Sequence, residues 1–406
     1  MIKSQRTSKY LHWTAASLLS VTAAQAYELN FGTNLPPVDV HGFASQGFLY
    51  SSDYNYLGDT EDGTGQFTEI GLNLTFSPFD RTRIAVQGFA FDVGDVGNLI
   101  PFLDYASIEY RFNDEIGLRG GRVRRPGGIY NHIQDVDLAR TSVLLPQGIY
   151  DSRWRDFNMS IDGGEVFGNI SLGQGGSFSY EGFGGMAHLS KEGGIARLLQ
   201  KTYHETGGTL DSLDSFISTG VQLWWNTPVD GLRVGALFAE SLDFGFHASQ
   251  PLPGEVMKMD STTDAFSQQY SIEYLWNNWT FQSEYYRTDQ STDMKQRSQM
   301  LGNSATSNDR TEQAWYVGAA YRFNKWFEAG SYYTEYYISP VTTGVNSDES
   351  QKDVALSLRF DPKDWWVLKL EGHFIRGTAL LQDNETNPNR NNDGWFMLAA
   401  KTTFSF

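Results

Sequence analysis

The sequence predicts an all-β fold: a transmembrane antiparallel up-and-down β-barrel of about 16 strands, with a long third loop folded into its lumen. Three observations predict it. Apolar and polar residues alternate with a period of two along most of the chain. Tight turns alternate with long polar segments, and aromatic residues gather beside the tight turns. A closed sheet with one face against lipid and the other against water accounts for all three.

Residues 1–26 have the layout of a secretory signal peptide. Lys3, Arg6 and Lys9 precede an apolar stretch that begins near Leu11, and Ala24-Gln25-Ala26 supplies a small-residue cleavage site. The apolar stretch is too short to span a bilayer as a helix. We therefore expect an exported chain in which 1–26 is a cleaved signal peptide and 27–406 forms one transmembrane barrel domain.

The composition narrows the class of protein further. The chain carries a net charge of −17, which argues against a nucleic-acid partner because such a partner requires a basic patch. There are no cysteines, so backbone pairing and burial must hold an exported chain together without disulfides. No group of residues has the spacing of a metal site, and we expect no cofactor.

The alternation is clearest in the last strand, "FMLAAKTTFSF". One row contains Leu398, Phe404 and Phe406, and the other contains Lys401 and Thr403. Successive side chains of a strand point to opposite faces, so we expect the Phe406 row to face lipid and the Lys401 row to face the lumen. The same pattern recurs in the segments 69–76, 105–112, 218–225, 270–276 and 353–360.

The connections predict the number of strands. Seven are tight turns, near Ser77–Arg81, Asn113–Asp114, Asp162–Gly164, Thr227–Gly231, Asn277–Asn278, Asn324–Lys325 and Asp361–Lys363. Eight are longer and polar, at 51–65, 93–101, 124–153, 174–213, 243–264, 291–309, 339–350 and 378–392. Fifteen connections require sixteen strands and place both chain ends on the tight-turn side. The segment 177–185 reads as a further strand, which leaves the count open by two.

A soluble β-sandwich also shows period-two alternation and turn signals. Two features favour the membrane barrel. Short turns and long loops alternate as they do in outer-membrane barrels, and aromatic residues flank the tight turns where an interfacial girdle is expected. These aromatic residues are Phe76, Phe112, Trp225, Trp276, Trp279, Phe323, Trp326, Phe360, Trp365 and Trp366.

With its signal peptide, sixteen alternating strands and terminal "TTFSF", the chain resembles the outer-membrane porins of Gram-negative bacteria. In that family a C-terminal phenylalanine is the signal read by the barrel-assembly machinery. The stretch "GLRGGRVRRPGGIYN", residues 117–131, resembles a segment of phosphate-selective and related porins. The resemblance implies passive passage of small hydrophilic solutes, a homotrimer, contact with outer-membrane lipid and lipopolysaccharide, and an inward third loop.

The third loop, Arg124 to Trp154, contains the apolar run "SVLLP" at 142–146. Such a run is unfavourable in open water, so we expect it to be buried against the barrel wall. The alternative is a surface loop that packs against its neighbours or a second subunit.

Charged residues of this loop and of the inward rows are the candidates for the pore. Arginines on three neighbouring strands predict a ladder that faces a loop of mixed charge, which favours anions. The candidate lining and constriction residues are Arg83, Glu109, Arg111, Arg119, Arg122, Arg124, Arg125, Asp135, Asp137, Arg140 and Arg153.

Three alternatives stay open. Tyr130, His132, Tyr150 and Trp154 could stack on sugar rings, which would make the channel saccharide-preferring. A lipid hydrolase would need an activated serine or histidine, and no GxSxG turn occurs where one is expected. An adhesin or receptor could use the long segment 174–213 for recognition.

Overall fold

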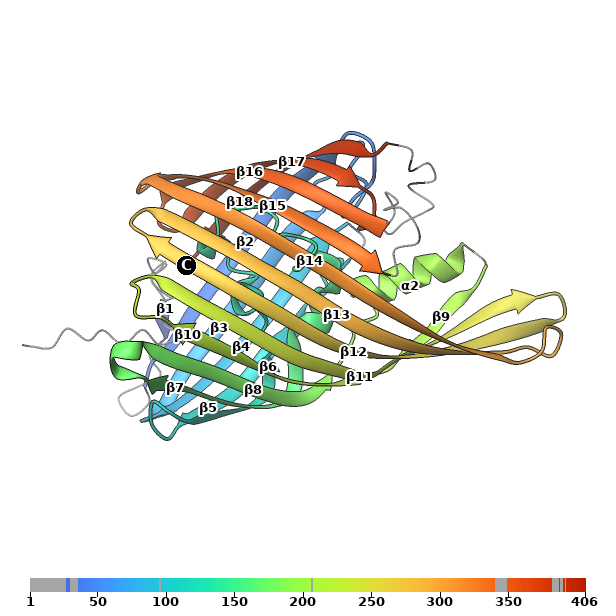
Figure 1. Cartoon of the computed structure of the whole chain (residues 1–406), viewed down its shortest axis with the longest axis horizontal. Coiled ribbons are helices and arrows are strands. Elements are labelled where there is room, and N and C mark those ends of the chain that lie inside the picture. The colour runs from blue at the N-terminus through green and yellow to red at the C-terminus, as the bar shows by residue number, and fades with distance from the viewer. Residues whose placement is uncertain are drawn as a thin grey trace, which may run out of the picture.

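The computed structural model describes residues 27–29, 36–94, 96–205, 207–339, 349–381, 387, 390 and 392–406. The expected signal peptide lies outside this part of the chain, and so does much of the connection 378–392. The described chain is dominated by one large antiparallel sheet that curls into a barrel (Figure 1).

Sixteen strands of the described chain form the wall. They are β2 (Val38–Ser51), β3 (Phe67–Phe79), β4 (Thr82–Val93), β5 (Phe102–Arg111), β6 (Gly117–Arg124), β7 (Ser160–Ser171), β8 (Ser177–Ala187), β10 (Phe216–Asn226), β11 (Leu232–Leu252), β12 (Glu255–Trp276), β13 (Trp279–Arg297), β14 (Ser304–Asn324), β15 (Phe327–Ser339), β16 (Ser350–Lys363), β17 (Trp366–Gly377) and β18 (Gly394–Ser405). Two short strands, β1 (Tyr27–Leu29) and β9 (Thr209–Leu213), add to the sheet beside β2 and β11.

The last strand closes the sheet on the first. β18 pairs antiparallel with β2 from Met397 opposite Ser51 to Ser405 opposite Phe43. The terminal residue continues this pairing, because the backbones of Phe406 and Gly42 exchange two hydrogen bonds, of 3.0 and 2.9 Å. β8 pairs with β10, so the ring of wall strands has no open edge between them. The predicted sixteen-stranded antiparallel barrel is confirmed.

The two rows of β18 face as the alternation predicts. Leu398 is 45% exposed and Phe404 equally so, whereas Met397 is fully buried and Lys401 is 3% exposed. The exposed row lies on the outside of the barrel and the buried row points toward the lumen. An overall polar chain can therefore present an apolar outer surface, because only every second residue contributes to it.

The aromatic residues beside the tight turns also lie on the outer surface. Trp276 and Trp279 flank one turn, Phe323 and Trp326 flank the next, and Trp365 flanks the one after. All of them are exposed at the turn end of the barrel. Their position matches the aromatic belt of a membrane interface.

One predicted turn is wrong. The sequence Asp162-Gly163-Gly164 lies inside β7, and the tight turn between β7 and β8 falls ten residues later, at 172–176, around the 3₁₀ turn η5 (Gly173–Gly175). The segment 177–185, which we treated as a further strand, is β8 itself. A Cβ added to Gly163 would lie 2.2 Å from the carbonyl oxygen of Gly184, so this glycine permits close strand contact rather than a turn.

Two predicted long loops are mostly strand. β11 and β12 continue through 243–264 to a turn at Pro253 and Gly254, and β13 and β14 continue through most of 291–309. Figure 1 shows these two hairpins protruding well beyond the rest of the barrel. A β-bulge between Ser241 and Phe244 marks the point where β11 leaves the rim.

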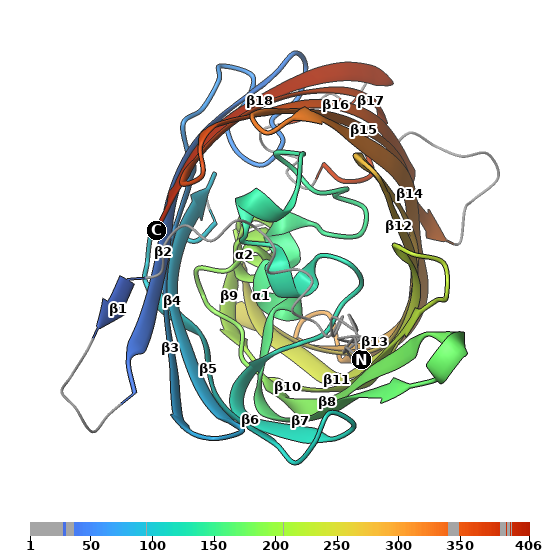
Figure 2. The same ribbon diagram turned by 90° about the vertical axis from the view of Figure 1, so that its left-hand side faces the viewer.

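The helices lie in two connections. α1 (Arg155–Asn158) and the 3₁₀ turns η2 (Asn131–Ile133), η3 (Asp137–Ala139) and η4 (Ser152–Trp154) belong to the third loop, and α2 (Gly194–His204) belongs to the connection between β8 and β10. No helix in the described part of the chain has the length and apolarity needed to cross a bilayer. Figures 1 and 2 together place α2 over the loop end of the barrel. Its Leu199 and Tyr203 pack against Phe246 and Met257 of the protruding hairpin.

Candidate functional site

The third connection, residues 125–159, lies inside the ring of strands, as Figure 2 shows, and we refer to it as the lumen loop. The apolar run at 142–146 is buried as expected: Val143 and Leu144 pack with Ala314 and Tyr336 of the wall, and Leu145 packs with Tyr332. The alternative of a loop on the outer surface is wrong.

An ionic anchor attaches the loop to the last strands of the barrel. Asp137 lies 3.1 Å from Lys401 Nζ and 3.5 Å from Lys369 Nζ, and it also accepts a hydrogen bond from Thr403. Arg140 of the loop is 3.2 Å away on the other side. Burial opposes ionisation of Asp137, but the adjacent lysines and Arg140 outweigh it and hold the pKa of this carboxyl below its usual value.

A second anchor, on β13, uses a carboxylate with neutral donors only. Glu284 accepts hydrogen bonds from the backbone nitrogen of Ile129 (2.9 Å) and the hydroxyl of Tyr150 (2.5 Å) in the loop. Ser271 and Tyr316 of the wall donate to it as well, at 2.6 and 3.1 Å. Glu284 is 1% exposed, and no described cation lies within ion-pair distance of it. A third carboxylate, Glu371, accepts from the backbone nitrogens of Val143 and Leu144 and also lies 3.0 Å from His373 Nε2.

The predicted arginine ladder exists, but its charges are paired within the wall. Arg119 contacts Glu109 at 2.9 Å and Glu165 at 2.8 Å, and Arg111 contacts Glu109 at 2.8 Å. Both guanidinium groups lie about 5 Å above the ring of Phe167. Arg83, which is exposed, donates to Thr75 at 3.5 Å. The field of this wall is therefore largely cancelled by neighbouring carboxylates.

Arg122 does not face the lumen. The inward row of β6 contains Arg119 and Val123, and Val123 is fully buried against Ile161 and Phe183. Arg122 belongs to the opposite row with Leu118 and pairs with Asp162 at 2.7 Å on the outside. The sequence prediction treated Arg122 as part of the third loop, but β6 extends to Arg124, so Arg122 lies within that strand.

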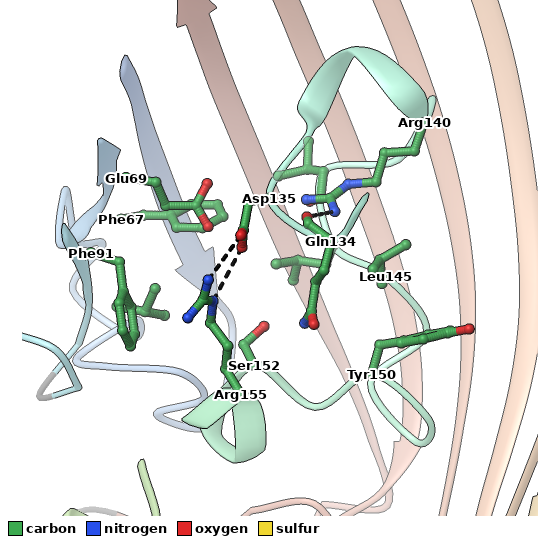
Figure 3. A pocket seen from close by; sticks show the side chains of 13 residues that line it. Phe67, Glu69, Phe91, Gln134, Asp135, Arg140, Leu145, Tyr150, Ser152 and Arg155 are labelled. Atoms are coloured by element: carbon green, nitrogen blue, oxygen red, sulfur yellow. Dashed lines mark hydrogen bonds and ion pairs between the residues drawn. The ribbon is translucent and has the colours of Figure 1, made fainter. Parts of the chain in front are cut away.

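Four charged side chains fasten the base of the loop to β5 and β6. Arg124 lies 2.6 Å from Asp104 and 2.5 Å from Asp135, while Arg155 lies 3.0 and 2.8 Å from the same two carboxylates. Figure 3 shows Asp135 and Arg155 joined in a pocket between Phe67 and Phe91 of the wall and Leu145 and Tyr150 of the loop. The pKa of Asp135 lies below its ordinary value, because the two arginines outweigh the effect of burial.

Two further candidates also carry partners. Arg153 lies 2.5 Å from Asp151 and donates to the carbonyl oxygen of Leu380. Arg140 is shared between Asp137 and the carbonyl oxygens of Gln134 and Val143.

The prediction from sequence missed the partners Asp104 and Glu165. The alternation did not identify them as inward residues. A β-bulge interrupts the alternation beside Asp104, and the turn that we predicted at 162–164 interrupted the strand that contains Glu165.

Arg125 differs from these arginines. It is 6% exposed, its Nη1 donates to Ser218 Oγ at 3.3 Å, and its Nε has no partner. No described carboxylate forms an ion pair with it. Burial lowers the pKa of Arg125, since nothing nearby offsets the desolvation of the guanidinium except the ring hydroxyl of Tyr286.

The residues that were proposed to stack on sugars contact other side chains of the protein instead. The rings of Tyr130 and Tyr150 are buried and meet edge to face at 5.6 Å, and Trp154 packs in the same manner on Phe157 at 5.9 Å. His132 lies 3.2 Å from Glu181 of β8. Among the described residues, no three His, Asp or Glu side chains form a group that could hold a metal ion.

These features define the sixteen-stranded, porin-like barrel of outer-membrane channels, with an inward third loop and a charged lumen. Solved structures that share the fold include the following three. A loop-deletion mutant of OmpT from Vibrio cholerae matches with a TM-score of 0.56 at 11% identity over 91% of this chain and 99% of that one. OmpF from Salmonella typhi, solved with daunomycin, matches at 0.55 and 14% over 94% and 100%. An anion-selective porin from Comamonas acidovorans matches at 0.52 and 13% over 91% and 99%.

These likenesses show the fold alone, because the identities are low. No protein-family model matches the chain, and no curated protein matches it either.

Proposed function

We propose that this protein is an outer-membrane channel through which small hydrophilic solutes diffuse passively, without a chemical step. The observation that carries the proposal is the opposition of the two faces of one closed sheet. Leucine and phenylalanine rows cover the outside, while charged and hydroxyl side chains line the inside. Such a wall suits a water-filled path across lipid. We further propose that residues 1–26 are removed on export and that three copies assemble in the membrane.

The experiment is to reconstitute the purified barrel in a planar lipid bilayer. Stepwise increases in conductance are expected, and each step should match the opening of one or three pores. Heat-modifiable mobility in a detergent gel confirms that the barrel is folded. A folded barrel that yields no conductance would contradict the proposal and favour the receptor or hydrolase alternatives.

We propose that the ion preference of this channel is mild and toward anions. Most lumen arginines are paired with adjacent carboxylates, which supports weak selectivity. Arg125, which forms no ion pair with a described carboxylate, supports a preference for anions. Replacing Arg119 and Arg124 by Ala should shift the reversal potential under a salt gradient toward cations, because Glu165 loses its arginine and Glu109 and Asp104 each lose one of two. An unchanged potential would remove these two arginines from the conduction path.

A further inference from the structure

The starting observation is the unusual state of Arg125 among the arginines of the lumen loop. Arg124, Arg140, Arg153 and Arg155 each contact at least one carboxylate. Arg125 has the same depth of burial and forms no ion pair with any described residue. A buried cation without a counter-charge is costly, so an anion that reaches it gains a strong interaction.

Hydroxyl groups surround the guanidinium of Arg125. Ser218 of β10 accepts its hydrogen bond, and Tyr286 of β13 interacts with it electrostatically. Tyr286 is in turn within 3.3 Å of Ser267, and Ser267 within 3.1 Å of Thr288. Hydroxyl donors beside an arginine form a common recognition site for carboxylate or phosphate oxygens.

Backbone hydrogen bonds hold Arg125 in place. The backbone nitrogen of Arg125 donates to Met159 at 2.8 Å and its carbonyl oxygen accepts from Asn131 at 2.6 Å, so the residue is held at both ends. Ser218 and Thr288 are buried, Tyr286 is partly buried, and Arg125 itself is 6% exposed. The Nε atom of Arg125 is buried and has no hydrogen-bond partner, so one donor of the guanidinium is unsatisfied.

From this geometry we propose that Arg125, with Ser218 and Tyr286, forms a binding site for a small oxyanion inside the pore. The occupant is either free inorganic phosphate or the carboxylate of an organic solute. The inference rests on the proposed channel function, because the channel delivers the anion to the site. It also adds to that function a specific point of attraction where the remaining lumen charges are neutralised by one another.

The test measures binding without relying on conduction. The refolded barrel in detergent is titrated with inorganic phosphate and, separately, with succinate, against a constant chloride background, by isothermal calorimetry. The wild-type chain should bind at least one of them, and Arg125→Gln should weaken that binding about tenfold or more, since a charge-assisted hydrogen bond is lost. Tighter binding of phosphate or of succinate identifies the source of the oxyanion.

Arg287→Gln provides the matched control. Arg287 follows Tyr286 on β13, lies on the opposite row, and pairs with Asp289 at 2.8 Å, so the substitution removes the same charge without touching the site. Absence of binding to the wild-type chain, or an equal loss in the two variants, would overturn the proposal. If Arg125→Gln does not fold, the double variant Ser218→Ala, Tyr286→Phe keeps the cation and should still weaken binding severalfold; unchanged binding would overturn it.

The two proposals fail in different ways. Conductance without oxyanion binding would refute this site and leave the channel intact. Oxyanion binding that depends on Arg125 in a barrel without conductance would refute the channel and keep the site. In a conducting barrel, phosphate or succinate should also lower the single-channel current of the wild-type chain more than that of Arg125→Gln.

Discussion

The lumen loop is attached to two parts of the wall by two different kinds of anchor. Near β17 and β18, Asp137 is an anion surrounded by Lys369, Lys401 and Arg140. On β13, Glu284 is surrounded only by neutral donors from Tyr150, Tyr316 and the backbone of Ile129. The first anchor depends on the balance of buried charge, and the second depends on the geometry of hydrogen bonds. The two should therefore respond differently to the loss of a carboxylate and to pH.

Removal of Asp137 should produce the largest effect. Asp137→Ala removes the carboxylate beside the buried Lys369 and leaves Lys401 with Glu69 as its remaining partner, which we expect to cost about 3–5 kcal/mol in the free energy of unfolding. Urea titration of the barrel in lipid vesicles, followed by tryptophan fluorescence, measures it. Asp80→Ala, in an exposed tight turn, is the control and should change little. A loss below about 1 kcal/mol would show that the ionic anchor is unimportant.

Glu284→Gln should have a smaller effect, about 1–3 kcal/mol, because the amide keeps one acceptor and no cation is abandoned. Local opening of the loop should increase as well, seen as faster protease cleavage within 125–159 while the barrel stays folded. A loss as large as that of Asp137→Ala would remove the distinction between the two anchors, since it would mean that the charge on Glu284 matters.

The pH dependence of stability can be tested at Asp156, a third buried carboxyl group of the lumen loop. Both of its carboxylate oxygens are buried, and one lies so near Gly193 that an added Cβ would meet it at 1.7 Å. Burial raises the pKa of Asp156 to about 6. The folded state therefore favours the protonated form, and the stability that this form contributes is complete at acid pH and is lost as the pH rises through 6.

Asp156→Asn should remove that dependence and stabilise the protein at pH 8 by about 1–2 kcal/mol, less than the full shift implies because the residue is partly exposed. Unfolding free energies at pH 4, 6 and 8 provide the measurement. Asp137, whose pKa lies below its usual value, should stay ionised throughout this range. Equal pH dependence in the wild-type chain and Asp156→Asn would contradict the assignment.

Arg122→Gln should have the smallest effect. Its ion pair with Asp162 is partly exposed on the outer face, so we expect a stability change of about 0.5 kcal/mol or less. Conductance and reversal potential should be unaltered, in contrast to the shift expected for Arg119. A change in ion selectivity would contradict this assignment and indicate that the Arg122 side chain lies in the lumen.

The sequence was most informative where lipid touches the chain. Period-two alternation predicted the rows of β18 and β3 and the girdle beside the tight turns, because a membrane makes every second residue apolar. The alternation did not predict the strands correctly in regions that do not contact lipid. The protruding parts of β11 and β12 bury Phe246 and Met257 against α2 instead of lipid, and their sequence, with a turn at Pro253 and Gly254, resembles a loop. The glycines at 163 and 164 resemble a turn, although close approach of β7 and β8 is what requires Gly163.

The sequence by itself determined the class of fold, the closure of the sheet through its last strand, and the burial of the run at 142–146. These follow from local alternation and from the cost of exposing apolar side chains or unpaired strand edges. Only the tertiary structure decided which charges meet. Asp137 and Lys401 are separated by 264 residues in the sequence. Their contact depends on how the lumen loop enters the barrel. That placement pairs most of the lumen arginines and leaves Arg125 without a carboxylate, because long-range ion pairing depends on distance in space and not on position along the chain.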